Sequence, residues 1–124
     1  MNYTVELFKR VNELEFGMSK DAVRQMLGAY TVAGKRDMFA HCFAEYADDK
    51  LISVEIFGDF TVEIGEVTFR SSDNLKEVGR KMLLLDPEAK LDPKAGASSR
   101  KLSIGTYFEN GFECILIGRE NYYR

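Results

Sequence analysis

The sequence contains no tryptophan, two prolines, two cysteines and a single histidine among its 124 residues. It also has no run of the roughly 20 apolar residues that a membrane-spanning helix needs. The N-terminal segment alternates charged and apolar side chains, unlike a signal peptide. From these absences we expect a cytoplasmic protein that forms a single domain over residues 1–124 and does not bind a membrane.

The short motifs that carry a known chemistry are absent as well. The sequence has no CxxC pair, no Walker loop, no GxSxG and no GxGxxG. Cys42 follows the only histidine, His41, but neighbouring residues on a strand point to opposite faces and cannot pair as thiolate and imidazole. We therefore expect no enzyme activity, no cofactor and no metal. Cys42 and Cys114 are predicted to be buried thiols in a reducing compartment.

The net charge is only −3, but the charge is distributed unevenly. Residues 37–69 contain eight acids against one base, a net of −7, while the rest of the chain carries +4. A net acidic chain argues against direct binding of nucleic acid, which needs a basic face. The acidic segment is either a solvated face or a docking surface for a basic protein.

Two helices are predicted from their ends and their apolar stripes. In residues 16–28, Ser19 is a good N-cap, Val23 begins an apolar face, and Gly28 can end the helix. A second helix begins within Ser71–Asn74, capped by Ser71, Ser72 or Asp73, and ends at Asp86. Tyr3–Leu14 fits either a strand or a helix, and we favour a short helix.

Consecutive strands are predicted from Met38 to Phe69. Ile52, Val54 and Ile56 alternate with Ser53 and Glu55, which is typical of a half-buried strand. Residues 47–50 and 58–59 are turns, residues 87–101 are a mobile surface loop, and an Asn-Gly turn makes a hairpin of residues 101–118. No sequence repeat of fixed period is present.

These elements predict an α+β fold, an antiparallel sheet of four to six strands with two or three helices packed on one face. The acids then gather on the open face. The candidate protein-binding residues are its acids and two neighbouring aromatics: Tyr46, Asp48, Asp49, Glu55, Asp59, Phe60, Glu63 and Glu66. Tyr122 and Tyr123 are either interface anchors or pack over the sheet edge. Carboxylate pairs such as Asp48 with Asp49, or Glu55 with Glu63, leave a small-ligand-binding or metal-assisted enzyme as the alternative function.

One stretch resembles a known family. Residues 8–29 place Phe8, Val11, Phe16, Gly17, Met18, Ser19, Val23 and Gly28 as they occur in the β-lactamase inhibitor protein and the related small outer-membrane assembly lipoprotein domain. That resemblance implies a helix-loop-helix laid on a four-stranded antiparallel sheet. The chain lacks the family's second GMS/T repeat and has no cysteine for lipidation near the N-terminus.

The later pattern, VEIFG, VTF, a capped helix and a hairpin ending in aromatics, is similar to small immunity proteins of bacterial toxin systems. This resemblance implies a protein that binds and blocks a toxin. An acidic surface would suit a basic nuclease cleft by matching its charge. We therefore expect an immunity or inhibitor protein with a basic protein partner.

Overall fold

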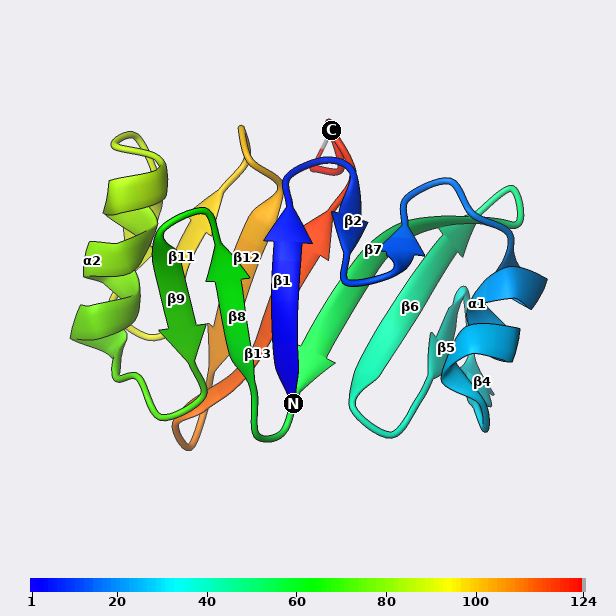
Figure 1. Cartoon of the computed structure of the whole chain (residues 1–124). Coiled ribbons are helices and arrows are strands. Elements are labelled where there is room, and N and C mark those ends of the chain that lie inside the picture. The colour runs from blue at the N-terminus through cyan, green and yellow to red at the C-terminus, as the bar shows by residue number, and fades with distance from the viewer. Residues whose placement is uncertain (124) are drawn as a thin grey trace.

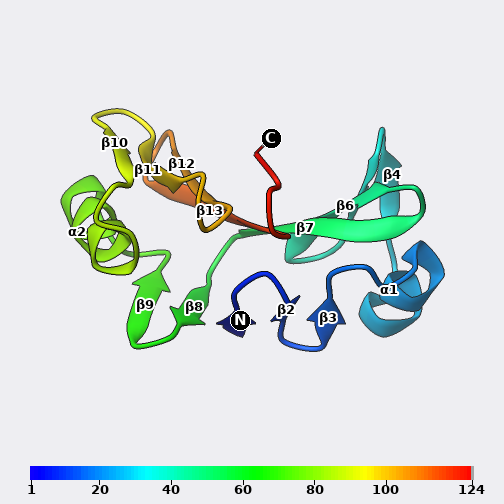
Figure 2. The ribbon, with the colours of Figure 1, turned by 90° about the horizontal axis from the view of Figure 1, so that it is seen from above.

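In the computed structural model, which describes residues 1–123, two β-sheets pack face to face and a helix lies at either end (Figures 1 and 2). The smaller sheet contains, in spatial order, β3 (Leu14–Glu15), β2 (Arg10–Val11), β1 (Asn2–Glu6), β8 (Thr61–Ile64) and β9 (Val67–Arg70). The larger sheet contains β10 (Lys90–Asp92), β11 (Gly96–Ser99), β12 (Ile104–Phe108), β13 (Phe112–Gly118), β7 (Lys50–Phe57), β6 (Cys42–Ala47), β5 (Arg36–Met38) and β4 (Thr31–Ala33). The helices are α1 (Lys20–Leu27) and α2 (Leu75–Leu85).

The predicted α+β fold with one sheet of four to six strands is therefore wrong. The protein is mostly β, with 48% strand and 15% helix, and its strands form sheets of five and eight. The prediction failed because period-two alternation shows that a strand has one buried face but not which sheet it joins. At Gly58 the chain leaves the larger sheet and enters the smaller one.

The topology contains a repeat that the sequence does not show. Two strands, a helix and four further strands run from β2 to β7, and the same order runs from β8 to β13. Each unit contributes four consecutive strands to the larger sheet, where β7 and β13 pair antiparallel at the centre. In the smaller sheet β1 lies between the two units, antiparallel to β2 and parallel to β8. Val23 of α1 and Val78 of α2 are both fully buried.

The N-terminal segment is strand, not the short helix that we favoured. Tyr3 and Val5 alternate with exposed residues on β1 and point into the core. Phe8 and Asn12 have φ angles of 67° and 52°, which a continuous helix cannot contain. Asn12 also accepts a hydrogen bond from the Thr4 amide at 2.8 Å, which fixes the turn after β1.

Both predicted helices are present. The Ser19 hydroxyl accepts a hydrogen bond from the Ala22 amide at 3.2 Å, and Gly28 ends α1 with a φ of 85°. The second helix is capped one residue later than predicted, by Asn74, which forms a capping box with Glu77. Asp73, one of the expected caps, instead accepts a hydrogen bond from the Arg70 amide.

Residues 87–101 do not form a mobile loop, because they contain β10 and β11. The hydroxyl of Ser99 donates to the buried carboxylate of Asp86 at 2.7 Å, and the Thr106 hydroxyl accepts from the Ala97 amide at 2.9 Å. These contacts are long-range, and the segment's composition gives no sign of them. The hairpin predicted around Asn110 and Gly111 is confirmed as β12 and β13.

The core lies between the two sheets and is closed by the helices. Leu51, Ile56 and Ile115 of the larger sheet and Ile64 and Phe69 of the smaller sheet are almost completely buried. Along residues 1–123, neither helix is long and apolar enough to cross a membrane.

Candidate protein-binding face

The outer face of the larger sheet is the largest sheet surface that neither helix of the described chain covers. Viewed from above, the two ends of this sheet curve away from the smaller sheet, so the outer face is concave (Figure 2). We call it the concave face and define it by the outward-pointing residues of β5, β6, β7, β12 and β13. They are Arg36, Met38, Phe43, Glu45, Ser53, Glu55, Phe57, Tyr107, Cys114 and Leu116.

Cross-strand pairing places these side chains in rows. Leu116 lies opposite Glu55, Glu55 opposite Phe43, and Phe43 opposite Met38. In the adjacent row, Tyr107 and Phe57 lie on either side of Cys114. Residues in such rows are direct neighbours, so the concave face is one continuous surface across the middle strands.

Aromatic side chains and one arginine dominate the middle of the concave face. The rings of Phe43 and Phe57 are 5.4 Å apart between centroids, and the Arg36 guanidinium lies 4.1 Å from the centre of the Phe43 ring. Tyr107 is 48% exposed. Aromatic residues, methionine and arginine are the residue types enriched in protein interfaces.

Two carboxylates lie among these aromatics and border a hollow of about 250 Å³. Glu45 accepts hydrogen bonds from the Ser53 hydroxyl, at 2.9 Å, and from the Tyr122 hydroxyl. Glu55 is 3.7 Å from Arg36 and is about a quarter exposed. Both acids are held in place but keep capacity for a further donor, which a cationic side chain could supply.

The thiol of Cys114 also lies on this face. Burial, with Glu55 next to it, raises the pKa of Cys114 to about 12, so the thiol stays protonated at neutral pH. A protonated thiol is a poor nucleophile, so Cys114 packs as a small apolar group.

The C-terminal tyrosines pack on the same face rather than projecting from it. Tyr122 lies against Gly118, where an added Cβ would be 2.6 Å from the Tyr122 Cβ, and Tyr123 lies over Gly105. The two tyrosine rings are 5.1 Å apart and almost perpendicular. The sequence left two interpretations of these tyrosines, interface anchors or residues that pack over the sheet, and their position in the structure is the second.

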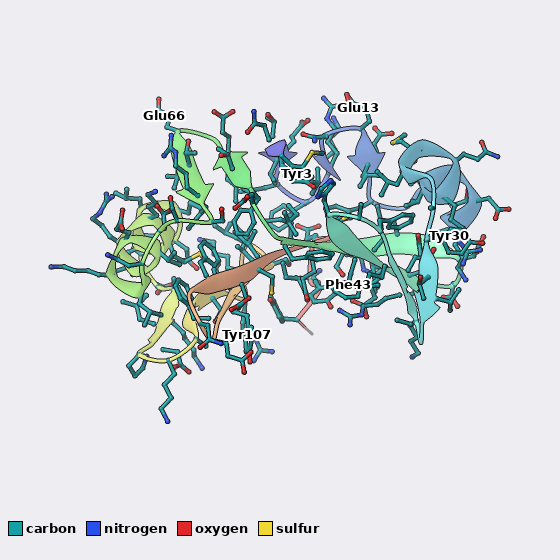
Figure 3. The ribbon with its side chains drawn as sticks, turned by 90° about the horizontal axis from the view of Figure 1, so that it is seen from below. Tyr3, Glu13, Tyr30, Phe43, Glu66 and Tyr107 are labelled. Atoms are coloured by element: carbon teal, nitrogen blue, oxygen red, sulfur yellow. The ribbon has the colours of Figure 1, made fainter. Side chains whose placement is uncertain are left out.

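The structure does not bring the predicted acidic residues together. Glu55 points outward from the larger sheet, whereas Glu63 points outward from the smaller sheet, on the opposite side of the molecule. Figure 3 shows Glu66 and Tyr107 on these opposite sides. The other acids are exposed in turns: Asp48 and Asp49 between β6 and β7, Asp59 between β7 and β8, and Glu66 between β8 and β9.

The two aromatic candidates are wrong, because both are buried. Tyr46 is 5% exposed and Phe60 is 4% exposed. Phe60 packs edge-on against Phe112 across the two sheets, with 5.1 Å between the ring centres. Neither side chain can contact a partner while the protein remains folded.

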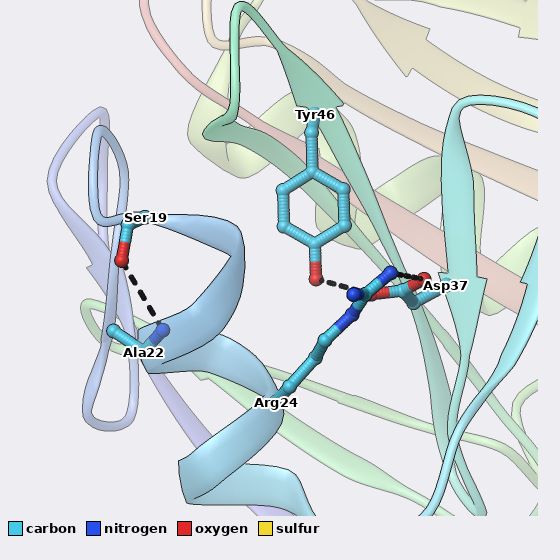
Figure 4. Close-up of polar contacts among 5 residues, drawn as sticks. All are labelled: Ser19, Ala22, Arg24, Asp37 and Tyr46. Carbon is cyan, nitrogen blue, oxygen red and sulfur yellow. Dashed lines mark hydrogen bonds and ion pairs between the residues drawn. The ribbon is translucent and has the colours of Figure 1, made fainter.

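Tyr46 instead takes part in a buried network that holds α1 on the larger sheet (Figure 4). The Arg24 guanidinium donates two hydrogen bonds, of 2.8 and 2.9 Å, to the Asp37 carboxylate, and the Tyr46 hydroxyl donates a third, of 3.0 Å. Asp37 is 1% exposed. The hydrogen bonds from Arg24 hold the pKa of Asp37 below its usual range. One of the eight acids of the acidic segment therefore forms a buried ion pair and adds nothing to a surface.

The sequence contains a signal for Phe43 and Phe57, two residues of the concave face that are not among the predicted binding residues. Alternation from Ser53 and Glu55 extends to Phe57, and the same pattern in β6 places Phe43 beside Glu45. On these two strands the predicted binding residues are only Tyr46 and Glu55, because a prediction based on acidic charge gives no weight to outward-pointing aromatic residues. The arrival of Tyr107 and Leu116 on the same face depends on the pairing of β7 with β13, which no local pattern reveals.

No group of three or more His, Cys, Asp or Glu side chains within residues 1–123 is placed to hold a metal ion. In the same part of the chain, every fully buried side-chain nitrogen or oxygen has a hydrogen-bond partner. Comparison of the chain with protein-family models, with curated proteins and with solved structures finds no match.

Proposed function

We propose that the protein is a non-catalytic binding module that engages a basic protein through the concave face, as an immunity or inhibitor protein engages a bacterial toxin. The observation that carries this proposal is a curved sheet face that neither helix covers and that Tyr122 and Tyr123 cover only in part. It carries aromatic and arginine side chains around two ordered carboxylates. A protein interface has this composition at its centre.

The charge of the face favours a cationic partner. Two carboxylates, Glu45 and Glu55, face one guanidinium, Arg36, and the exposed Asp48 and Asp49 lie at the turn beyond Glu45. Opposed charges steer two proteins together and select the partner more than they add raw affinity. The aromatic rows would then supply most of the contact area.

The cytoplasm is the compartment we propose, and the thiols support it. Cys42 and Cys114 are both free, which fits a reducing environment. Burial raises the pKa of Cys42 to about 11, so this thiol, like that of Cys114, resists oxidation while the fold is intact.

The experiment is co-expression with the protein encoded by the adjacent gene, followed by growth measurement and affinity co-purification. The proposal predicts protection and a stable complex. Glu55→Lys should weaken both, whereas Glu63→Lys, a matched charge reversal on the opposite side of the molecule, should leave both unchanged. Absence of protection and of a complex with the unaltered protein would reject the proposed function.

A second variant guards against misfolding of Glu55→Lys. Tyr107→Ala removes an exposed ring and leaves the core untouched. It should weaken the complex at least about fivefold if the concave face is the interface, since truncating an interface anchor costs more than about 1 kcal/mol. Full affinity in both variants would place the interface elsewhere.

A further inference from the structure

A cavity of about 340 Å³ lies between the two sheets at the α1 end, on the opposite side of the larger sheet from the concave face. Its walls come from β1, the β2–β3 turn, the end of α1 and the β5–β6 connection. The volume falls within the range of roughly 300 to 1,000 Å³ that small-molecule sites occupy.

The buried part of the cavity is apolar, whereas Asn12, Glu13 and His41 contribute polar groups to its more exposed lining. Met26 and Leu27 at the end of α1 line its mouth and are 47% and 37% exposed. Phe39 and Cys42 on the floor are almost completely buried. Methionine is flexible, so the mouth can adapt to the shape of a ligand.

One polar group in this apolar floor has no partner. Tyr3 is 7% exposed, lines the cavity, and its hydroxyl makes no hydrogen bond to any residue from 1 to 123. Every side-chain oxygen that is fully sealed from solvent in this part of the chain does have a partner. The Tyr3 hydroxyl therefore opens into the cavity it lines.

Asn12, a polar side chain on the cavity wall, bonds to other groups than this hydroxyl. The Asn12 amide is already engaged, accepting from the Thr4 amide and donating to the Asn2 carbonyl. Burial, with Cys42 nearby, raises the pKa of Tyr3 to about 12, so the phenol is a proton donor at neutral pH. A ligand that places an acceptor beside this hydroxyl gains a hydrogen bond that the cavity shields from bulk water.

We propose that this cavity binds a small neutral molecule with an apolar body and one carbonyl oxygen, which accepts a hydrogen bond from the Tyr3 hydroxyl. The buried walls around the ligand body are apolar and the Tyr3 hydroxyl fixes the ligand's orientation, which is how such sites obtain specificity. Glu13 and His41, the ionisable side chains among the lining residues outside Tyr3 and Cys42, are exposed, and the buried lining residues carry no charge. An ion drawn into that buried part would lose its hydration without a counter-charge, so a charged ligand is disfavoured.

The test uses two probes of nearly identical shape, acetophenone and α-methylstyrene, which differ by a carbonyl oxygen in place of a methylene group. Each is titrated into the ¹⁵N-labelled protein and followed by amide chemical shifts. The proposal predicts saturable shifts at Leu14, Leu27 and Phe39 and tighter binding of the ketone.

Three variants separate the contribution of the Tyr3 hydroxyl to probe binding from that of the cavity itself. Tyr3→Phe deletes only the hydroxyl and should weaken acetophenone about five- to tenfold, while leaving α-methylstyrene unchanged. Tyr107→Phe removes a hydroxyl on the concave face and should change neither affinity. Ala40→Trp, at the exposed rim, should abolish both by filling the mouth.

Equal affinity for acetophenone in the wild type and in Tyr3→Phe would overturn the proposal. So would chemical-shift changes from acetophenone that map outside the cavity, or titrations in which neither probe saturates the protein. A monomer-to-dimer equilibrium that Ala40→Trp abolishes would also overturn it, because the cavity mouth would then be covered by a second copy. Tyr3→Phe should fold normally, since the hydroxyl has no partner to lose, and Ala40→Trp tests the site independently.

Discussion

Loss of Arg24 should destabilise the protein strongly, because it leaves a buried carboxylate without its counter-charge. Arg24→Met keeps most of the apolar stem and removes the guanidinium that donates two hydrogen bonds to Asp37. Removing one member of a buried ion pair costs roughly 3–5 kcal/mol. The Arg24 side chain is 23% exposed and the Tyr46 hydroxyl still donates to Asp37, so we expect the lower end, about 3 kcal/mol.

A second substitution should recover part of this loss. Asp37→Asn removes the uncompensated charge while retaining an oxygen that can accept from Tyr46. The double variant Arg24→Met/Asp37→Asn should therefore be more stable than Arg24→Met alone. The double-mutant cycle should give a coupling energy above about 1 kcal/mol, as for residues in one network.

The destabilisation should also depend on pH. The pKa of Asp37 is lowered in the native state, mainly by the hydrogen bonds from Arg24. The ionised carboxylate therefore adds to the free energy of unfolding above the pKa of the unfolded carboxyl, and this stabilisation is lost as the pH falls through the native pKa. The difference between wild type and Arg24→Met should therefore narrow below about pH 4.

Urea unfolding followed by far-UV circular dichroism, at neutral pH and near pH 3, measures both effects. If Arg24→Met lowers the free energy of unfolding by less than about 1 kcal/mol at neutral pH, Arg24 does not compensate a buried charge. An unchanged difference at acid pH would refute the assignment of that charge to Asp37.

The remaining predictions concern the glycines and the tyrosines. Gly118→Ala should lower the free energy of unfolding by about 1–3 kcal/mol, because the new Cβ would lie 2.6 Å from the Tyr122 Cβ and displace Tyr122. Gly79→Ala in α2 should instead raise it by up to about 1 kcal/mol, because the nearest atom to the new Cβ is 3.5 Å away. Urea unfolding checks both, and equal effects would contradict the packing of Tyr122 described above. Burial raises the pKa of Tyr3 to about 12 and also raises that of Tyr46. Unfolded phenols ionise near pH 10, so the free energy of unfolding should fall as the pH rises above about 10, and thermal melts that stay constant to about pH 11 would contradict this.

The features that local chemistry determines could be predicted from the sequence. Ser19 and Gly28 mark the ends of α1 through single side-chain and backbone properties, and Asn110 with Gly111 makes its hairpin for the same kind of reason. The inward alternation of Val54 and Ile56, and of Val62 and Ile64, was equally predictable. Each of these signals extends over only a few neighbouring residues.

Sheet membership could not be predicted in this way. Glu55 and Glu63 follow the same alternating pattern, yet the turn at Gly58 sends them to opposite sides of the molecule. Residues 87–101 have a loop-like composition, and they form strands because Ser99 and Thr106 make long-range hydrogen bonds. The concave face exists only because β7 pairs with β13. In this pairing Val54 lies opposite Ile117, which is 63 positions further along the chain.

The binding constant of the purified complex tests the central claim, that the concave face is the interface, most directly. The partner from the co-expression experiment is titrated calorimetrically into wild type, Glu55→Lys and Glu63→Lys, each at low and at moderate salt. Glu55→Lys should weaken binding about tenfold or more and reduce its salt dependence, because a like charge then faces a basic partner. Glu63→Lys should bind as the wild type does, and the reverse order of the two variants would contradict the account.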